Sequence, residues 1–268
     1  MSKAERSRGC SVWITAACAL VSMGVQSRAT AEAAPVVATT LFARGAVTAS
    51  AGGNVRLLGN RMLVHRNDVL STGRRSFVIL RFNDGTKMTL RPKTVFRVDE
   101  YREKPGSESM LFRLFRGGLR AVTGLLSKRR PGSLRIRTAL ATIGIRGTDF
   151  AARLCGEGDC AGNGAVVGGG AGESGGGGGS PRPGLWATVF DEGQMTLSRP
   201  GSGGGELKLT RGQAALAGAG ALNRLPAGPP RFLLQDGYFQ LNTVPDTDIE
   251  RGQFREPEKP SLGCKVGG

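Results

Sequence analysis

The chain has 268 residues, enough for one or two domains with a substantial core. Its 37 Lys and Arg residues outnumber 21 Asp and Glu, so the formal net charge is +16 and the surface favours polyanions. The chain has a single histidine, His65, and no serine nucleophile motif, which argues against the common hydrolase triads.

Residues 1–33 have the pattern of a secretory signal peptide. Basic residues precede an apolar stretch, Val12–Val25, and alanines at 29–33 offer cleavage sites. A membrane anchor is the alternative, but this stretch is shorter than the ~20 residues that span a bilayer. Cys18 could accept a lipid, although no apolar residue stands three positions before it. We expect a cleaved leader and a periplasmic or secreted protein, attached to a membrane only if the leader is uncleaved or lipidated.

Loss of the leader would lower the net charge only to +14. Export argues against nucleic acid as a partner, and leaves acidic polymers and acidic proteins of the envelope as the polyanions to consider.

Residues 44–155 are built from short alternating runs between turn residues, a pattern that predicts an all-β domain. The clearest hairpin begins with Phe77–Phe82, a strand with apolar residues on both faces. The turn Asn83-Asp84-Gly85 follows, in which glycine accepts positive φ, and Thr86–Leu90 forms the return strand.

Further strands and a bend are expected downstream. The strands are Val95–Val98, Met110–Phe115 and Leu134–Thr138. Two glycines, Gly117 and Gly118, bend the chain after the second of them. Arg135 and Arg137 alternate with an isoleucine, which is typical of a solvated sheet face; a dedicated polyanion-binding patch is the alternative.

The segment 141–150 closes this series of strands. We expect its two isoleucines to share one face and its small residues to let neighbouring backbone approach closely, at Ala141, Gly144 and Gly147. Arg146 is expected to fan across the sheet or to pair with Asp149 or Asp84, a structural role.

Two cysteines follow at a short spacing. In an oxidising compartment Cys155 and Cys160 would close a small loop by a disulfide. Zinc is the alternative, but it requires four ligands, and only the distant Cys264 and His65 remain to complete the set. Cys264 would then be a free thiol or form an intermolecular bond.

The last part of the chain changes composition three times. Residues 156–184 are Gly-rich and predict a flexible, disordered insertion. Strand patterns resume over 185–220 as a continuation of the β domain, with a domain boundary in the Gly-rich tract as the alternative. Residues 221–268 form a Pro-rich tail in which Phe232–Leu234 and Tyr238–Phe239 could dock, with disorder beyond about Asp246.

The order and spacing of these segments from Arg44 to Leu154 resemble the extracytoplasmic domain of FecR-type proteins. A weaker resemblance continues as far as Ala217. The family motif, interpreted as structural, comprises Asp84, Gly85, Gly144, Arg146, Gly147 and Thr148. The resemblance implies a twisted β-sandwich or short β-roll and no cofactor. FecR-type regulators relay signals to alternative sigma factors, but only nine residues precede Cys10 here, so we expect no cytoplasmic arm and a stand-alone exported module.

Three functions are then open. The first is a protein-interaction or signal-relay module with an envelope protein as partner, bound through a sheet edge or a basic face. The second is binding of envelope polysaccharide or another acidic polymer. The third, hydrolysis by paired carboxylates, is disfavoured because each candidate falls at a turn or motif with a local structural role: Asp84, Asp149, Asp191 and Glu192. We therefore expect that the protein is not an enzyme.

Overall fold

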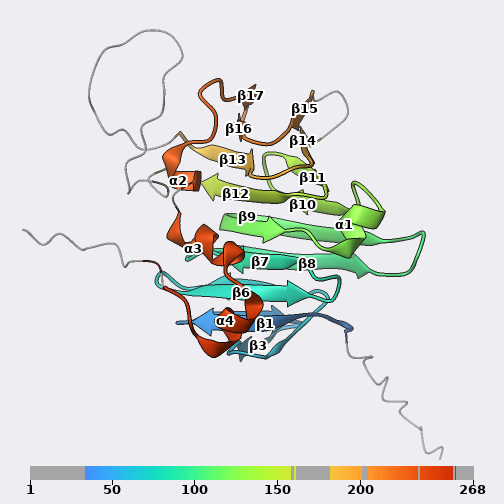
Figure 1. Cartoon of the computed structure of the whole chain (residues 1–268), viewed down its shortest axis with the longest axis vertical. Helices are drawn as coiled ribbons and strands as arrows, with labels where there is room; N and C mark the ends of the chain where they lie inside the picture. Colours follow the sequence, from blue (N-terminus) through green and yellow to red (C-terminus); the bar gives the residue numbers. More distant parts are fainter. Residues whose placement is uncertain are drawn as a thin grey trace, which may run out of the picture. The chain divides into compact units, whose positions relative to one another are not determined.

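The computed structural model describes residues 34–157, 160, 182–200, 205–234, 236–255 and 257, which form mostly β-strands (Figure 1). The strands are β1 (Val36–Arg44), β2 (Val47–Ala51), β3 (Asn54–Leu57), β4 (Leu63–His65), β5 (Val69–Thr72), β6 (Phe77–Phe82), β7 (Lys87–Leu90), β8 (Val95–Arg102), β9 (Ser109–Val122), β10 (Leu134–Arg137), β11 (Thr142–Arg146), β12 (Asp149–Cys155), β13 (Gly184–Val189), β14 (Gln194–Ser198), β15 (Glu206–Leu209), β16 (Ala214–Ala217) and β17 (Leu222–Arg224). The helices are α1 (Leu125–Arg129), α2 (Arg231–Leu234), α3 (Gly237–Gln240), the 3-10 helix η1 (Leu241–Thr243) and α4 (Asp246–Arg251). The predicted all-β class is confirmed.

The strands form two sheets that share β9. Sheet A has the order β4-β1-β6-β7-β9-β12-β13-β16-β17. Sheet B has the order β3-β2-β5-β8-β9-β10-β11-β14-β15. All of these pairs are antiparallel except β9 with β10.

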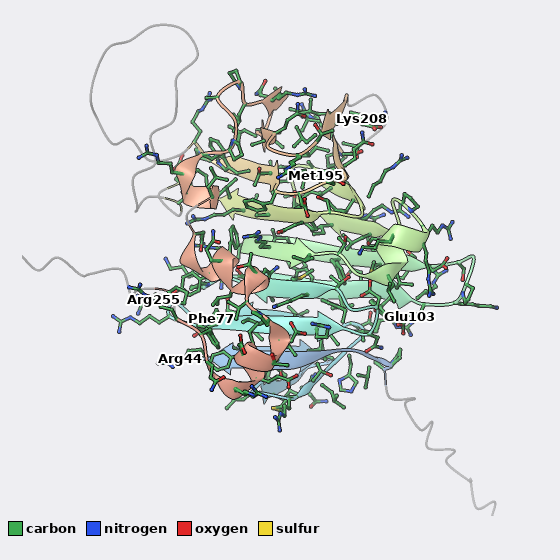
Figure 2. The ribbon with its side chains drawn as sticks, in the orientation of Figure 1. Arg44, Phe77, Glu103, Met195, Lys208 and Arg255 are labelled. Atoms are coloured by element: carbon green, nitrogen blue, oxygen red, sulfur yellow. A yellow bond between two sulfur atoms is a disulfide. The ribbon has the colours of Figure 1, made fainter. Side chains whose placement is uncertain are left out.

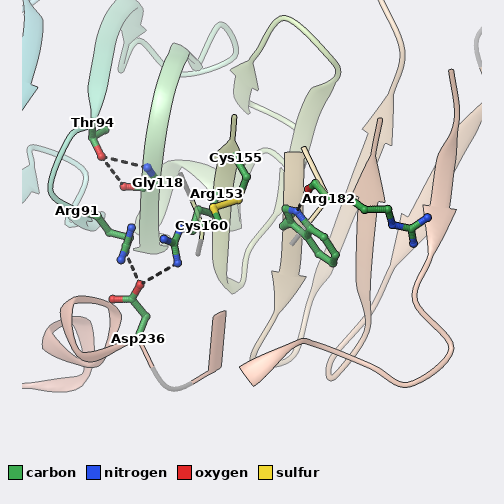
Figure 3. The surroundings of a disulfide bond; sticks show 9 residues. Arg91, Thr94, Gly118, Arg153, Cys155, Cys160, Arg182 and Asp236 are labelled. Atoms are coloured by element: carbon green, nitrogen blue, oxygen red, sulfur yellow. Dashed lines mark hydrogen bonds and ion pairs between the residues drawn. A yellow bond between two sulfur atoms is a disulfide. The ribbon is translucent and has the colours of Figure 1, made fainter. Parts of the chain in front are cut away.

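Strand β9 passes from one sheet to the other at Gly117. Residues 109–116 pair with β8 in sheet B, whereas residues 117–122 pair with β12 in sheet A. Gly117 has φ +84°, and a Cβ at this position would lie 2.5 Å from the Cα of Thr94. Thr94 also holds the next residue, because its hydroxyl accepts from the Gly118 N–H and donates to the Gly118 C=O, both at 3.1 Å (Figure 3). Glycine is therefore required at the bend, as the sequence predicts.

The core lies between the two sheets, because alternate residues of each strand point inward. Sheet A contributes, among others, Val78, Leu80, Phe82, Met88, Leu90, Leu119, Phe150 and Ala187. Sheet B contributes, among others, Leu70, Phe96, Val98, Met110, Phe112, Leu114, Ile136, Ile143, Ile145 and Leu197. The sandwich form of the prediction is confirmed by this shared core.

The C-terminal segment, residues 231–254, covers the outer face of sheet A, as α2, α3 and α4 show in red in Figure 1. Phe232 and Phe239 pack with Trp186, and Ile249 packs with Phe77, which Figure 2 shows beside this segment. Both faces of β6 are therefore buried, as its sequence predicts.

Disorder beyond about Asp246 is wrong for residues 246–255. Helix α4 forms there after Pro245, and its Ile249 is fully buried. A tail rich in proline can still fold when prolines fall between short helices and apolar residues find a face to cover.

The sequence and the structure differ in two further places. The first strand begins at Val36, ahead of the predicted start at Arg44, and β9 is much longer than Met110–Phe115. Strand β12 before the Gly-rich tract pairs with β13 after it, so the strands on both sides of the tract belong to one sheet. Among the described residues no helix has the length and apolar character needed to cross a bilayer. The leader, most of the Gly-rich insertion and Cys264 lie outside the described residues.

Candidate functional site

The outer face of sheet B carries a row of arginines on three neighbouring strands. Arg97 on β8 is in register with Arg113 on β9, and Arg113 is in register with Arg137 on β10. These residues point outward because their neighbours Phe96, Phe112 and Ile136 point into the core. Since adjacent strands lie about 4.8 Å apart, the row spans roughly 10 Å.

One carboxylate lies within this row. Asp99 Oδ1 is 2.9 Å from Arg97 Nε, and Asp99 Oδ2 is 3.0 Å from an Arg113 terminal nitrogen. The guanidinium of Arg113 also lies 5.8 Å from the ring centroid of Phe115, which is 47% exposed. Asp99 therefore forms ion pairs with two arginines of the row, which share its one negative charge.

The two arginines of β10 have no carboxylate partner among the described residues. Arg135 and Arg137 are exposed, and neither forms an ion pair with any residue that the structure describes. Arg135 is in register with Gly144, where an added Cβ would meet no atom closer than 3.9 Å. Arg146, at the end of β11, is exposed as well.

We define the arginine face by these residues: Arg97, Asp99, Arg113, Arg135, Arg137 and Arg146. It carries five positive charges and one negative charge. Because the C-terminal segment covers sheet A and none of its helices packs on sheet B, this face of the described part of the chain remains open. It can bind anionic groups by charge-assisted hydrogen bonds.

The carboxylates expected as partners of Arg146 are engaged elsewhere, so the alternative in which Arg146 pairs with Asp149 or Asp84 is wrong. Arg120 binds Asp149 through two nitrogens, with Nε to Oδ1 at 2.8 Å and a terminal nitrogen to Oδ2 at 2.5 Å. Asp84 accepts from the Thr86 N–H at 3.1 Å and the Thr86 hydroxyl at 2.8 Å. Arg146 extends to solvent instead.

The carboxylates considered for catalysis have separate environments. Asp84 is buried in the turn after β6, where the hydroxyl of Tyr101 accepts from its N–H at 2.9 Å. Asp149 forms the ion pair with Arg120, and Asp191 and Glu192 are exposed in the turn before β14. Burial and the neighbouring Asp84 raise the pKa of Tyr101. The structure engages two of these carboxylates in local contacts and leaves the other two in solvent.

The small residues of the 141–150 segment serve different purposes from the one expected. An added Cβ at Gly144 would make ordinary contacts with Thr196 at 3.9 Å, so the expected close backbone approach does not occur there. Gly147 adopts φ +50° beside Thr148, whose hydroxyl donates to the Asp191 C=O at 3.1 Å. The close approach occurs at Gly193, where a Cβ would lie 2.3 Å from the Gly147 oxygen.

The predicted disulfide between Cys155 and Cys160 is present and joins the cluster that contains Trp186 (Figure 3).

His65 is half-buried, with Nδ1 3.2 Å from an Arg56 nitrogen. In the part of the chain that the structure describes, no group of three or more His, Cys, Asp or Glu residues could hold a metal ion.

Sequence reasoning found Arg135 and Arg137 but missed the rest of the row. Arg97 and Arg113 are also outward residues of predicted strands, so alternation could have identified both. Their registration, and the position of Asp99 at an irregularity of β8, depend on how strands pair across the sheet.

The fold and face define a class: an all-β sandwich with one sealed sheet face and one open, basic sheet face. Residues 68–165 match the family described as FecR protein, a span that runs from the residue before β5 past the end of β12. This part of the chain is therefore similar to a FecR domain, and the similarity supports a signalling or regulatory role.

Two crystal structures of a candidate anti-sigma factor from Parabacteroides distasonis are similar to this chain. The first is 13% identical, with a TM-score of 0.42, and covers 69% of this chain and 74% of that chain. The second is 15% identical, with a TM-score of 0.38, and covers 58% of each. A search of the curated proteins finds no match.

Proposed function

We propose that this protein is an exported, non-enzymatic FecR-domain protein that acts as an interaction or signal-relay module in the bacterial envelope. Its arginine face would bind an acidic surface of a partner protein. The observation that carries this proposal is the registered row Arg97, Arg113 and Arg137, which faces outward with Asp99 as its one counter-charge.

The electrostatics of the face fit a protein partner. Like charges on adjacent strands repel one another, so a row of arginines costs stability unless a partner supplies negative charge. Asp99 offsets part of the repulsion between two of these arginines before a partner docks. Such faces mainly set association rate and partner choice.

Export is supported by the leader pattern of residues 1–33 and by the Cys155–Cys160 disulfide, since disulfides persist in oxidising compartments. Cell fractionation and N-terminal sequencing of the mature protein test this part. A full-length cytoplasmic chain with reduced thiols would contradict it.

The binding experiment uses charge reversal at exposed arginines. Arg135→Glu with Arg137→Glu changes the face by four charges, and neither residue has an ion pair to lose within the described residues. The control is Arg74→Glu with Arg75→Glu, the same change on exposed arginines in the turn between β5 and β6. Cross-linking in envelope extracts should recover an acidic partner with wild type and control, and at least tenfold less with the face variant. Equal recovery by all three proteins would contradict the proposal.

An acidic polysaccharide is the second candidate, favoured by the row itself, because its arginines repeat at the strand spacing and would suit a linear polyanion. Retention on immobilised polygalacturonate, which weakens as salt rises, measures this activity. If the face variant is retained as strongly as wild type, the polymer does not use this face.

A further inference from the structure

Strand β3, Asn54–Leu57, is an open edge of sheet B. It pairs with β2 on one side, and the Leu58 N–H donates to the Val47 C=O at 2.8 Å. Hydrogen-bonded and non-hydrogen-bonded pairs alternate along an antiparallel ladder, so Asn54 and Arg56 face β2. The N–H and C=O groups of Val55 and Leu57 therefore face away from the sheet, and none of them has a hydrogen-bond partner among the residues that the structure describes.

The side chains on this edge are apolar and exposed. Val55 is 68% exposed and Leu57 is 71% exposed, the highest values among the large hydrophobic residues in the described ranges. Sheet edges in soluble proteins usually carry charged residues or proline, which discourage further pairing. The opposite edge of sheet B follows this rule, because Glu206 and Lys208 are the outward residues of β15.

The edge is held rigidly by Arg56. Its two terminal nitrogens bind the Asp68 carboxylate at 3.0 and 2.5 Å, and one of them also donates to the Leu63 C=O at 3.0 Å. The buried Asp68 carboxylate accepts from the His65 N–H as well, at 2.7 Å. A strand fixed in this way loses little conformational entropy when another strand is added.

The residues around β3 favour binding of an acidic segment. A shallow hollow of about 630 Å³ lies beside the strand, lined among others by Ser50, Gly52, Gly53, Val55, Val69 and Arg97. It joins the edge to the first residue of the arginine face. Residues 54–69 contain three arginines and one aspartate, and that aspartate is already bound to Arg56.

A second copy of the chain is a poor occupant. Two four-residue strands paired edge to edge bury far less than the roughly 1,200 Å² of a stable interface. A longer extended segment can pair with β3, cover Val55 and Leu57, and continue over the hollow to Arg97.

We propose that β3 is a strand-addition site for an extended segment of an acidic partner protein. The segment pairs with the free N–H and C=O groups of Val55 and Leu57, places apolar side chains on these two residues, and directs a carboxylate to Arg97. This inference rests on the proposed function and names the recognition mode of the same partner.

The probe is a synthetic ten-residue peptide of alternating valine and glutamate, titrated into the full chain labelled with ¹⁵N. Binding should slow hydrogen exchange of the Val55 and Leu57 amides at least tenfold and leave exposed helix amides unchanged. A peptide N-methylated at every residue should give no slowing, because neither of its edges keeps an N–H donor. Exchange that is unaffected by the unmethylated peptide, or slowed equally by both, would overturn the proposal.

Two variants test the edge in the protein. Val55→Pro removes the outward N–H while leaving the Asn54 and Arg56 bonds to β2, and Leu57→Gln removes an apolar contact without adding a charge. Each substitution should weaken binding of the peptide at least tenfold. Leu125→Gln is the matched control, since Leu125 is 56% exposed on α1. The first outcome to distinguish is that both edge variants still bind the peptide and the envelope partner, whereas the Arg135/Arg137 variant no longer binds the partner. In that case the strand-addition site is refuted and the proposed function stands. If partner recovery is unaffected in all variants, the proposed function fails.

Discussion

Asp236 joins the C-terminal segment to sheet A, and its replacement by alanine is expected to destabilise the protein strongly. Its carboxylate pairs with Arg91 and lies 3.8 Å from a terminal nitrogen of Arg153 (Figure 3). It also caps α3, because it accepts from the Tyr238 N–H at 3.0 Å. The Asp236 side chain is 3% exposed, and the two arginines are 15% and 10% exposed.

The magnitude follows from these contacts. Removing one partner of a buried ion pair costs about 3–5 kcal/mol, because the remaining charge is left without compensation. Loss of the helix cap adds about 1 kcal/mol. Contacts with aromatic rings reduce this cost, because both guanidinium groups keep them after the substitution. Arg91 lies 5.6 Å from the ring centroid of Phe239, and Arg153 lies 5.3 Å from that of Phe232. We expect a loss of about 4 kcal/mol for Asp236→Ala.

Urea unfolding followed by tryptophan fluorescence measures this change, because Trp186 lies beneath the same segment. At a slope of about 3 kcal/mol/M, the midpoint should fall by about 1.3 M. Glu250→Ala, an exposed carboxylate on α4, is the control and should shift stability by less than about 0.5 kcal/mol. A loss below about 1 kcal/mol for Asp236→Ala would refute the view that this carboxylate holds the segment in place.

Three further changes have defined outcomes. Gly117→Ala should lower the free energy of unfolding in urea by about 3 kcal/mol, because the φ is positive and the added Cβ would contact neighbouring backbone. Gly144→Ala, where the added Cβ would meet no atom closer than 3.9 Å, should change this free energy by less than about 0.5 kcal/mol. Equal effects of the two substitutions would contradict the requirement for glycine at the bend. Cys155→Ser should cost about 2 kcal/mol, as expected for a short closed loop, and a reductant should then have no further effect on thermal unfolding. Burial and the neighbouring Arg81 lower the pKa of Lys87 from 10.5 to about 8, so the unfolded chain binds more protons above pH 8. Stability relative to Lys87→Met should therefore rise from pH 8 to 10, and a fall would contradict the shift.

The fold class could be predicted because strand alternation is local. Phe77–Phe82 is predicted to the residue, since two-residue periodicity and the following turn define this strand. The helices at 231–251 could not be predicted equally well, because each is only one or two turns long and is stabilised by sheet A.

The candidate site was only partly predictable for a related reason. Alternation places Arg135 and Arg137 outward, but the alignment of Arg137 with Arg113 depends on the parallel pairing of β9 with β10. The open β3 edge depends on which strands remain unpaired in space, a property that no local pattern of Val55 and Leu57 reveals.

The shared strand β9 has a mechanical consequence. Its main chain is continuous from Ser109 to Val122, so one covalent chain enters the hydrogen-bond ladders of both sheets. Sliding of one sheet over the other would have to stretch or unpair this strand, whereas sheets joined by loops can shear. A pull applied at the arginine face would therefore pass along the backbone of β9 to sheet A and the segment docked on it, and the two sheets would move as one body.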